Sequence, residues 1–209
     1  MAYRFEHPAK KRNARRSKLI RSLNKLRYLK SDLKYHKEEQ VDRKVKFDAD
    51  IIAYMRQNDL EYSPAKQKTG LIIDDHLNQQ RKQEITKEIK KECKSLYKSI
   101  AKETHPDVNL SKEEEMQNLR EVIFQNAKKA FDGDDWFSLY DYALDLDIEL
   151  PIPTASQIKW LEQESDRIEN VIRLIETSFE WIYGSKETKE EKEGILIKYC
   201  LMFCYDKNI

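Results

Sequence analysis

The sequence predicts an all-α protein, and composition, periodicity and punctuation each support this fold class. Charged residues make up 37% of the 209 residues and apolar residues 39%, with only four Gly and five Pro, which is typical of helix-rich proteins. Apolar residues recur at spacings of three and four, whereas alternating, strand-like stretches of useful length are absent from the sequence. Pro and Gly interrupt the pattern at 63–70, 105–111, 132–135, 151–153 and 184, where we expect helices to end.

Residues 1–18 form a basic arm without a hydrophobic period. Five of its cations could contact phosphates or other anions, including nucleic acid: Lys10, Lys11, Arg12, Arg15 and Arg16. A disordered arm or the solvated start of a helix explains the same residues, and no recognised nucleic-acid-reading motif accompanies them.

Residues 19–62 read as one long helix or a helical hairpin. Two groups of apolar residues carry the three/four spacing: Leu19, Leu23, Leu26 and Leu33, then Val41, Val45, Ile52 and Met55. The charged surroundings of this stripe favour packing along a narrow seam, as in a coiled coil. Residues 63–75 break the pattern and are expected to form a loop or hinge.

Residues 76–149 contain a strongly amphipathic helix, with residues 74–89 read as its amino-terminal extension. Its apolar side carries Ile85, Ile89, Cys93, Leu96 and Ile100, and its opposite side carries Lys87, Lys91, Lys94, Lys98 and Lys102. We expect the helix to stop near Thr104, because Pro106 lacks an N–H donor and disfavours a helical conformation at His105. Ser111 could cap a second helix, with Glu114 at the capping-box position.

A basic helix that ends in His105-Pro106-Asp107 and is followed by a second helix resembles the J-domain of DnaJ-type co-chaperones. Tyr97 and Ala101 precede His105 by eight and four residues, where that family commonly has Tyr and Ala, and Asn109 matches a frequent Asn after the Asp. The run FQNAKKAFDGDD followed by WFSLYDYALDL is similar to the end of the third helix and the next leucine-rich helix of short J-proteins. A first helix with the family's Tyr-x-x-Leu-Gly pattern is not recognisable, so the resemblance is to an atypical J-domain.

The resemblance implies a fold and a function. The fold is a J-like antiparallel helix pair with a His-Pro-Asp loop, embedded in a body of long, partly coiled-coil helices. The function is binding of a DnaK-type (heat-shock-70 class) chaperone and stimulation of its ATPase through His105, Pro106 and Asp107. Ammonium groups on one helix face steer an acidic partner surface, and the candidates here are Lys91, Lys94, Lys98 and Lys102.

Residues 154–209 form a helical carboxy-terminal segment, separated from the J-like segment by Leu150-Pro151-Ile152-Pro153. A heptad seam is expected to run as far as Gly184, through Ile158, Leu161, Ser165, Ile168, Ile172, Ile175, Phe179 and Ile182. Residues 185–194 read as a loop or frayed helix, and residues 195–205 as a last buried helix. The seam could serve self-association. We predict, however, that it packs against the basic segments 19–33 and 41–55, because its own flanks are acidic.

Charge and cysteine usage narrow the class of protein further. Residues 1–46 contain 16 Lys/Arg and 5 Asp/Glu, whereas residues 108–194 contain 10 and 21, so the net charge of +1 hides two opposed blocks. The three cysteines, Cys93, Cys200 and Cys204, form no even disulfide framework and are read as packed thiols and not as metal ligands. With neither an apolar signal segment nor a stretch long enough to span a bilayer, a cytoplasmic location is expected, in the host cytoplasm if the protein is viral, without membrane binding.

The sequence does not predict an enzyme. It contains no phosphate-binding Gly-rich loop, no Gly-x-Ser-x-Gly elbow and no His-Glu-x-x-His pair, so we assign no catalytic residues, cofactor or metal. The Asp74-Asp75-His76 cluster is explained as a helix start, and Asp132, Asp134 and Asp135 as hydrated surface acids. The alternative to a co-chaperone is a structural or scaffold helical protein, part of a viral or cellular assembly, that retains a J-like helix pair and a basic arm.

Overall fold

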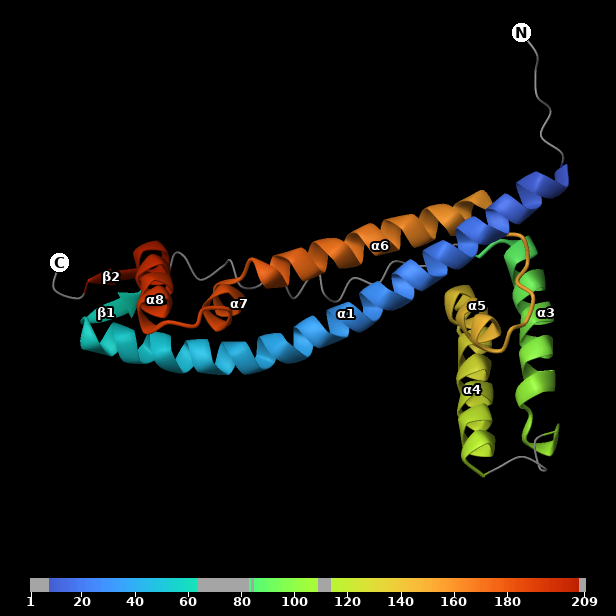
Figure 1. The fold of residues 1–209 in the computed structure, drawn as a ribbon, viewed down its shortest axis with the longest axis horizontal. Helices are drawn as coiled ribbons and strands as arrows, with labels where there is room; N and C mark the ends of the chain where they lie inside the picture. Colours follow the sequence, from blue (N-terminus) through green and yellow to red (C-terminus); the bar gives the residue numbers. More distant parts are fainter. Residues whose placement is uncertain (1–7, 64–82, 84, 109–113, 207–209) are drawn as a thin grey trace, which may run out of the picture. The chain divides into compact units, whose positions relative to one another are not determined.

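The computed structural model describes residues 8–63, 83, 85–108 and 114–206, and within this part the chain is largely helical (Figure 1). The residues fall into two compact units. Unit 1 comprises Met1–Asn24 and Arg81–Glu162, and unit 2 comprises Lys25–Gln80 and Gln163–Ile209. Helices α1 (Pro8–Gln57) and α6 (Ala155–Glu176) contribute residues to both units. The predicted all-α class is confirmed, with the addition of one very small sheet.

Unit 1 is built around helices α3 (Lys87–Thr104), α4 (Glu114–Asp132) and α5 (Trp136–Asp145). Helix α3 begins later than expected: the Thr86 side chain accepts a hydrogen bond from the backbone N–H of Ile89 and has an extended backbone, so it is the N-cap. The prediction that the basic helix extends far upstream is therefore wrong for residues 83, 85 and 86. Asp74, Asp75 and His76 lie outside the described residues, as do most of the expected hinge (63–75) and Ser111.

Helices α3 and α4 run antiparallel and share an apolar core. Pairs along them meet in reverse order: Glu103 with Arg120 near the turn, Tyr97 with Phe131, and Lys90 with Asp134 at the far end. The predicted inner face of α3 is buried, with Ile89, Cys93, Leu96 and Ile100 all inside. On α4 the inward positions include Ala127 and Ala130, whereas Leu119 is exposed.

Helix α5 contacts both α3 and α4 and supplies the buried aromatic side chains of this core. Its buried residues are Trp136, Phe137, Leu139, Tyr140 and Ala143. The Tyr140 hydroxyl donates to the Glu92 carboxylate at 3.1 Å and accepts from the Gln157 amide at 3.2 Å. Because these polar atoms satisfy one another, the core tolerates them, and burial raises the pKa of both Tyr140 and Glu92.

The segment between α5 and α6 is non-helical, as the two prolines predicted. Leu150 and Pro153 are buried, and the Thr154 hydroxyl accepts a hydrogen bond from the backbone N–H of Gln157 at 3.2 Å, which starts α6. In the same unit, Lys18 of α1 pairs with Glu162 of α6 at 2.7 Å.

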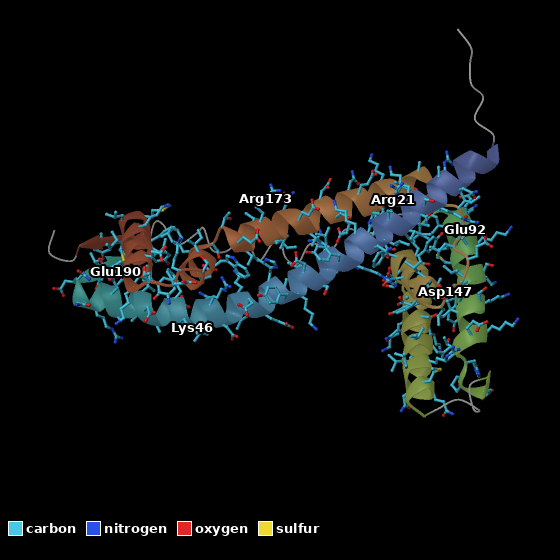
Figure 2. All side chains as sticks on the ribbon, viewed as in Figure 1. Arg21, Lys46, Glu92, Asp147, Arg173 and Glu190 are labelled. Carbon is cyan, nitrogen blue, oxygen red and sulfur yellow. The ribbon has the colours of Figure 1, made fainter. Side chains whose placement is uncertain are left out.

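In unit 2, the remaining part of α1 packs against α6 and the helix after it. The contacts advance in the same direction along both segments, so these run parallel. Lys25 pairs with Glu169 at 2.9 Å, His36 contacts Glu176 at 3.3 Å, and Gln40 donates to Glu180 at 3.0 Å. Within this unit the expected pairing of the basic amino-terminal helix with the acidic carboxy-terminal one is confirmed. Charged side chains such as Lys46 and Arg173 lie on the exposed surfaces of these helices (Figure 2).

The stripe predicted on the second half of α1 is largely wrong. Leu19, Leu23 and Leu26 are buried and Leu33 is half-buried, but Val41, Val45 and Ile52 are exposed. The buried face of this half instead carries His36, Phe47, Ile51 and Met55. This buried face begins at a polar residue, His36. A search for apolar residues passes over it and therefore indicates a different face.

The predicted seam is buried as far as Ile175, but it does not follow one continuous helix. Helix α6 ends at Glu176, and the Ser178 side chain caps a new short helix, α7 (Phe179–Gly184), by accepting from the Trp181 N–H. Phe179 and Ile182 are therefore half-buried members of a second element. The stripe from Ile158 to Ile175 is covered by this chain itself.

The last helix, α8 (Lys189–Phe203), begins within the stretch read as a loop or frayed helix. Thr188 and Glu191 form a capping box that fixes its start. Strands β1 (Leu60–Tyr62) and β2 (Cys204–Asp206) pair antiparallel, with Glu61 opposite Tyr205. The expectation that residues 60–62 and 204–205 are helical is therefore wrong. The core beneath them contains Phe47, Ile51, Met55, Tyr183, Leu196 and Cys200.

No helix in the described part of the chain combines the length and the apolar character needed to cross a membrane.

Candidate functional site

The turn between α3 and α4 carries His105, Pro106 and Asp107, and local chemistry explains its shape. The Thr104 hydroxyl donates to the Ile100 carbonyl at 2.8 Å, and the His105 N–H donates to the Ala101 carbonyl at 2.8 Å. At His105 the backbone leaves the helix (φ −58°, ψ 134°), as the residue before a proline should. Pro106 then opens a 3₁₀ turn over Pro106–Val108. The helix ends where the sequence predicted.

The two polar side chains of this turn differ in exposure and in role. The Asp107 carboxylate is 85% exposed, whereas the His105 side chain is 45% exposed. The Asp107 N–H donates to His105 Nδ1 at 3.3 Å, and the imidazole makes an edge contact with Phe124 at 5.2 Å between ring centroids. His105 thus holds the turn together, and Asp107 presents a largely exposed carboxylate, one oxygen of which lies 3.5 Å from His105 Nδ1.

Helix α4 is fixed against this turn by contacts that the sequence did not reveal. The Arg120 guanidinium donates to the Glu103 carbonyl at 2.5 Å, near the last turn of α3. Further along, the rings of Tyr97 and Phe131 stack at 4.8 Å with an interplanar angle of 8°. Arg120 could not be assigned from sequence because Leu119, Ile123 and Phe124 could each begin the inward face of this helix. Asn109 lies outside the described residues.

The outward face of α3 carries a row of cations, called here the lysine row: Lys87, Lys91, Lys94, Lys98 and Lys102. All five are exposed, as predicted. Within the part of the chain that the structure describes, none of them forms an ion pair, whereas the neighbouring Lys90 pairs with Asp134 at 3.0 Å. The row is therefore a positively charged surface that extends back from the His-Pro-Asp turn along the helix.

The basic arm is in part a regular helix. Helix α1 begins at Pro8, so residues 8–18 are helical; the side chains of Lys10, Lys11 and Arg12 lie outside the described set. Arg15 is exposed, but Arg16 is half-buried and forms an ion pair with Glu149. Arg16 is thus paired with a carboxylate within unit 1, and an anion contact of the basic arm stays a prediction.

The acidic residues after α4 have structural partners. Asp135 caps α5: its carboxylate accepts from the Ser138 N–H at 3.1 Å and from the Ser138 hydroxyl at 2.6 Å. Gln83 donates to the same carboxylate at 2.5 Å and accepts from the Phe137 N–H at 3.1 Å. These contacts account for Asp135 without catalysis.

A second polar cluster, in unit 2, was not found from sequence. The imidazole of His36 is buried between Asp32, whose carbonyl lies 2.9 Å from Nδ1, and Glu176, and it stacks on Trp181 at 4.7 Å. The Arg43 guanidinium lies 4.0 Å from the ring centre of Trp181 and donates to its carbonyl at 3.1 Å. His36 and Arg43 are seven residues apart, on one face of α1, and each forms a contact with the indole of Trp181. This cluster joins α1 to α7.

The cysteines are packed thiols. Cys93 and Cys200 are buried, and burial raises the pKa of Cys93 to about 11 and of Cys200 to about 12, so both are protonated at neutral pH. Among the described residues, no group of three or more His, Cys, Asp or Glu side chains is arranged to hold a metal ion.

Comparison with known proteins adds no constraint on this site. The chain matches no protein-family model, no curated protein and no solved structure. Its function has to be argued from the geometry of the His-Pro-Asp turn and the lysine row.

Proposed function

We propose that this protein is a DnaJ-like co-chaperone that binds a DnaK-type chaperone and stimulates its ATPase. One observation carries the proposal: a His-Pro-Asp turn with an exposed carboxylate joins two antiparallel helices, and the first of them carries an exposed lysine row that forms no ion pair with the described residues. The turn and the row follow one another along a single rigid element, as a bipartite contact surface requires. The flanking helices would serve targeting or assembly.

Each residue of the turn has a role that its chemistry suits. Pro106 stiffens the backbone, and the exposed Asp107 carboxylate can accept a charge-assisted hydrogen bond from a cationic group of the chaperone. His105 fixes the turn through the Asp107 N–H and Phe124. The protein makes and breaks no bond of ATP itself; by binding one conformation of the chaperone more tightly, it shifts the population towards the hydrolysing state.

The lysine row suits a partner whose docking surface is acidic. Exposed ammonium groups interact weakly once they are screened by salt. Their main effect is therefore on encounter, by raising the association rate. Lys94 and Lys98 lie in the middle of the row and are the residues on which this steering depends most.

The decisive experiment measures ATP turnover of a DnaK-type chaperone with the full chain added. Wild-type protein should stimulate turnover, and His105→Gln should abolish stimulation while the helical circular dichroism signal is unchanged. Glu121→Gln, a change of an exposed polar residue on α4, is the matched control and should stimulate like the wild type. If the wild type does not stimulate at concentrations that saturate binding, the proposal fails.

The role of the lysine row is tested by charge reversal. Lys94→Glu/Lys98→Glu should lower the association rate with the chaperone about tenfold at low salt, with a smaller effect at high salt. The control is Lys189→Glu/Lys198→Glu, which reverses two exposed charges on α8 of unit 2 and should leave the rate unchanged. Equal effects of the two double variants would show that net charge, and not the row, governs association.

A role in an assembly is the second candidate, favoured by α8. This helix leaves Ile197, Leu201 and Met202 exposed, and Leu201 is 77% accessible. Exposed apolar clusters of this kind mark interaction surfaces. Light scattering of the wild type against Leu201→Glu decides: a fall in oligomeric mass without any chaperone stimulation by the wild type would favour assembly over co-chaperone activity.

A further inference from the structure

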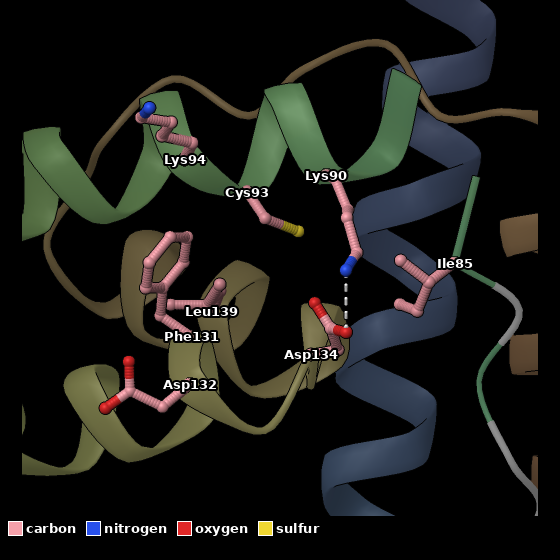
Figure 3. Close-up of a pocket in the computed structure, with 8 residues that line it drawn as sticks. All are labelled: Ile85, Lys90, Cys93, Lys94, Phe131, Asp132, Asp134 and Leu139. Carbon is pink, nitrogen blue, oxygen red and sulfur yellow. Dashed lines mark ion pairs between the residues drawn. The ribbon is translucent and has the colours of Figure 1, made fainter. Parts of the chain in front are cut away.

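Unit 1 contains a cavity of about 390 Å³ that has no part in the His-Pro-Asp turn (Figure 3). It lies where the first turns of α3 meet the end of α4 and the start of α5. From Lys90 to His105 the chain advances fifteen residues, or about 22 Å along a helix. The cavity and the turn are therefore separate places on one helix pair, and a ligand at one need not touch the other.

The floor of the cavity is apolar. Ile85, Phe131 and Leu139 line it, and the sulfur of Cys93 points into it (Figure 3). Burial raises the pKa of Cys93 to about 11, so at neutral pH the thiol is uncharged and behaves as a small apolar group. Phe131 stacks on Tyr97 with one ring face, which fixes it as a wall. The volume matches the lower end of ligand pockets and suits one large apolar side chain.

The rim of the cavity carries opposite charges on its two sides. Lys90 and Lys94 line it from α3, and Asp132 and Asp134 line it from the end of α4 and the following turn. Lys90 and Asp134 pair at 3.0 Å, but their side chains are 60% and 51% exposed, so the pair contributes little and opens at small cost. On the α3 side the positive charge continues into the lysine row; on the other side it is replaced by carboxylates.

We propose that this cavity binds an extended acidic segment of a partner protein through one large apolar side chain. The apolar side chain, of the size of Leu or Phe, enters between Cys93, Phe131 and Leu139. Acidic residues beside it lie over α3, where Lys90 and Lys94 accept them, because on the opposite rim Asp132 and Asp134 would repel them. Apolar anchoring in the cavity and charge complementarity over α3 together select the segment, and neither depends on the co-chaperone function.

The probe for this site is a fluorescein-labelled pentapeptide amide, Glu-Glu-Phe-Asp-Glu, with binding to the full chain measured by fluorescence anisotropy at low salt. An otherwise identical peptide with Ala in place of Phe should bind at least tenfold more weakly, and a peptide with Lys at the four acidic positions should not bind measurably. Equal affinity of the Phe and Ala peptides would mean that only the lysine row is involved, and the cavity would be excluded as a site.

Two variants locate the site. Cys93→Leu enlarges the floor side chain and should weaken the Phe peptide about tenfold without changing the affinity for the Ala peptide. Lys90→Glu/Lys94→Glu, both exposed, keeps the core intact and should weaken both peptides, so the test stands even if Cys93→Leu does not fold. The matched control is again Lys189→Glu/Lys198→Glu. Wild-type affinity for the Phe peptide in folded Cys93→Leu, or in Lys90→Glu/Lys94→Glu, would overturn the proposal.

Alkylation of the native thiols gives an independent measurement. With N-ethylmaleimide and peptide mapping by mass spectrometry, saturating Phe peptide should slow modification of Cys93 at least threefold. Cys200, in unit 2, is the internal control and should react at an unchanged rate. No protection of Cys93 would overturn placement in the cavity.

The cavity proposal and the co-chaperone proposal are contradicted by different results. Loss of peptide binding with intact ATPase stimulation excludes only the cavity, whereas absence of stimulation by the wild type excludes only the co-chaperone function. His105→Gln should abolish stimulation and leave the peptide affinity unchanged.

Discussion

Cations on the helices of the two units differ in whether they form ion pairs. In unit 2, cations of α1 lie opposite carboxylates, either on the same helix, as Lys44 with Asp48, or on α6, as Lys25 with Glu169. In unit 1, five lysines follow one another along α3 without an ion pair among the described residues. These cations of unit 2 are paired within the fold, whereas the lysine row of α3 has no such partner in the part of the chain that the structure describes.

The cores differ in a related way. The core of unit 1 combines aliphatic residues of α3 with the aromatic residues of α5, and a polar contact within it links Tyr140, Glu92 and Gln157. Unit 2 joins α1 to α7 through polar and aromatic groups, with Trp181 contacted by both His36 and Arg43 and the Tyr183 hydroxyl bonded to Asp50. Unit 1 is thus held by burial of apolar surface under an open charged face, and unit 2 by burial together with specific polar contacts.

The largest expected effect comes from removing a buried aliphatic side chain from the seam of α6. Ile172 is 7% exposed, so Ile172→Ala should lower the free energy of unfolding by about 2–5 kcal/mol. The matched control is Leu174→Ala on the same helix, 39% exposed, which should change it by less than about 0.5 kcal/mol. Urea denaturation followed by circular dichroism measures both, and an Ile172→Ala variant as stable as Leu174→Ala would contradict the packing of unit 2.

Much of this seam could be predicted because a heptad pattern directly reports one buried face. Ile158 to Ile175 were found in this way, as was the inner face of α3. The end of the helix was missed because the pattern continues through Phe179 and Ile182 while the backbone does not. The signal that could have located the break was Ser178, whose side chain caps the next helix.

Other features could not be found from sequence, for physical reasons. The buried face of the second half of α1 includes His36, whose burial depends on a carboxylate (Glu176) and an indole (Trp181) supplied by residues 140 or more positions away. Strands β1 and β2 have three residues each, too short for an alternating pattern, and pair across more than 140 residues. For the candidate site, the sequence indicated the His-Pro-Asp turn and the lysine row, but not the cavity, which forms only where α3, α4 and α5 meet.

The cluster of His36, Arg43 and Trp181, which joins α1 to α7, is tested at Gly184, the last residue of α7. A Cβ added there would lie 2.8 Å from Cγ and Cδ of Arg43, so Gly184→Ala should displace Arg43 from Trp181 and cost about 1–3 kcal/mol. Gly194 is the matched control: it lies inside α8 with no atom within 4 Å of the added Cβ, and Gly194→Ala should stabilise by about 0.5–1 kcal/mol. Thermal unfolding of the two variants should therefore shift in opposite directions, and shifts in the same direction would show that Arg43 does not fill this space.

The buried thiols predict a loss of stability at alkaline pH in each unit. Folding raises the pKa of Cys93 to about 11 and of Cys200 to about 12 from an ordinary value of 9.0, so above pH 9 the unfolded chain loses a proton that the folded chain keeps. The free energy of unfolding should then fall with rising pH, from pH 9 to about 11 for Cys93 and to about 12 for Cys200. Between pH 9 and about 11 both thiols contribute, so Cys93→Ala should roughly halve their slope there, measured by urea denaturation from pH 8 to 11. An unchanged slope would show that the Cys93 environment does not resist ionisation.

The smallest expected effect compares a lysine that forms an ion pair in unit 2 with a lysine of the lysine row in unit 1. Lys25→Ala removes one exposed ion pair with Glu169 and should destabilise by less than about 1 kcal/mol. Lys98→Ala removes the repulsion between Lys98 and two other lysines, Lys94 and Lys102, each four residues away along the helix. It should therefore raise the free energy of unfolding by about 0.2–0.5 kcal/mol for each repulsive pair. Both changes should diminish in 1 M salt, because the Debye length falls to about 3 Å. Opposite signs at low salt would mean that the lysine row costs the fold stability and is retained for a contact outside it, whereas destabilisation by Lys98→Ala would mean that the row stabilises unit 1 and would remove the charge argument for a partner.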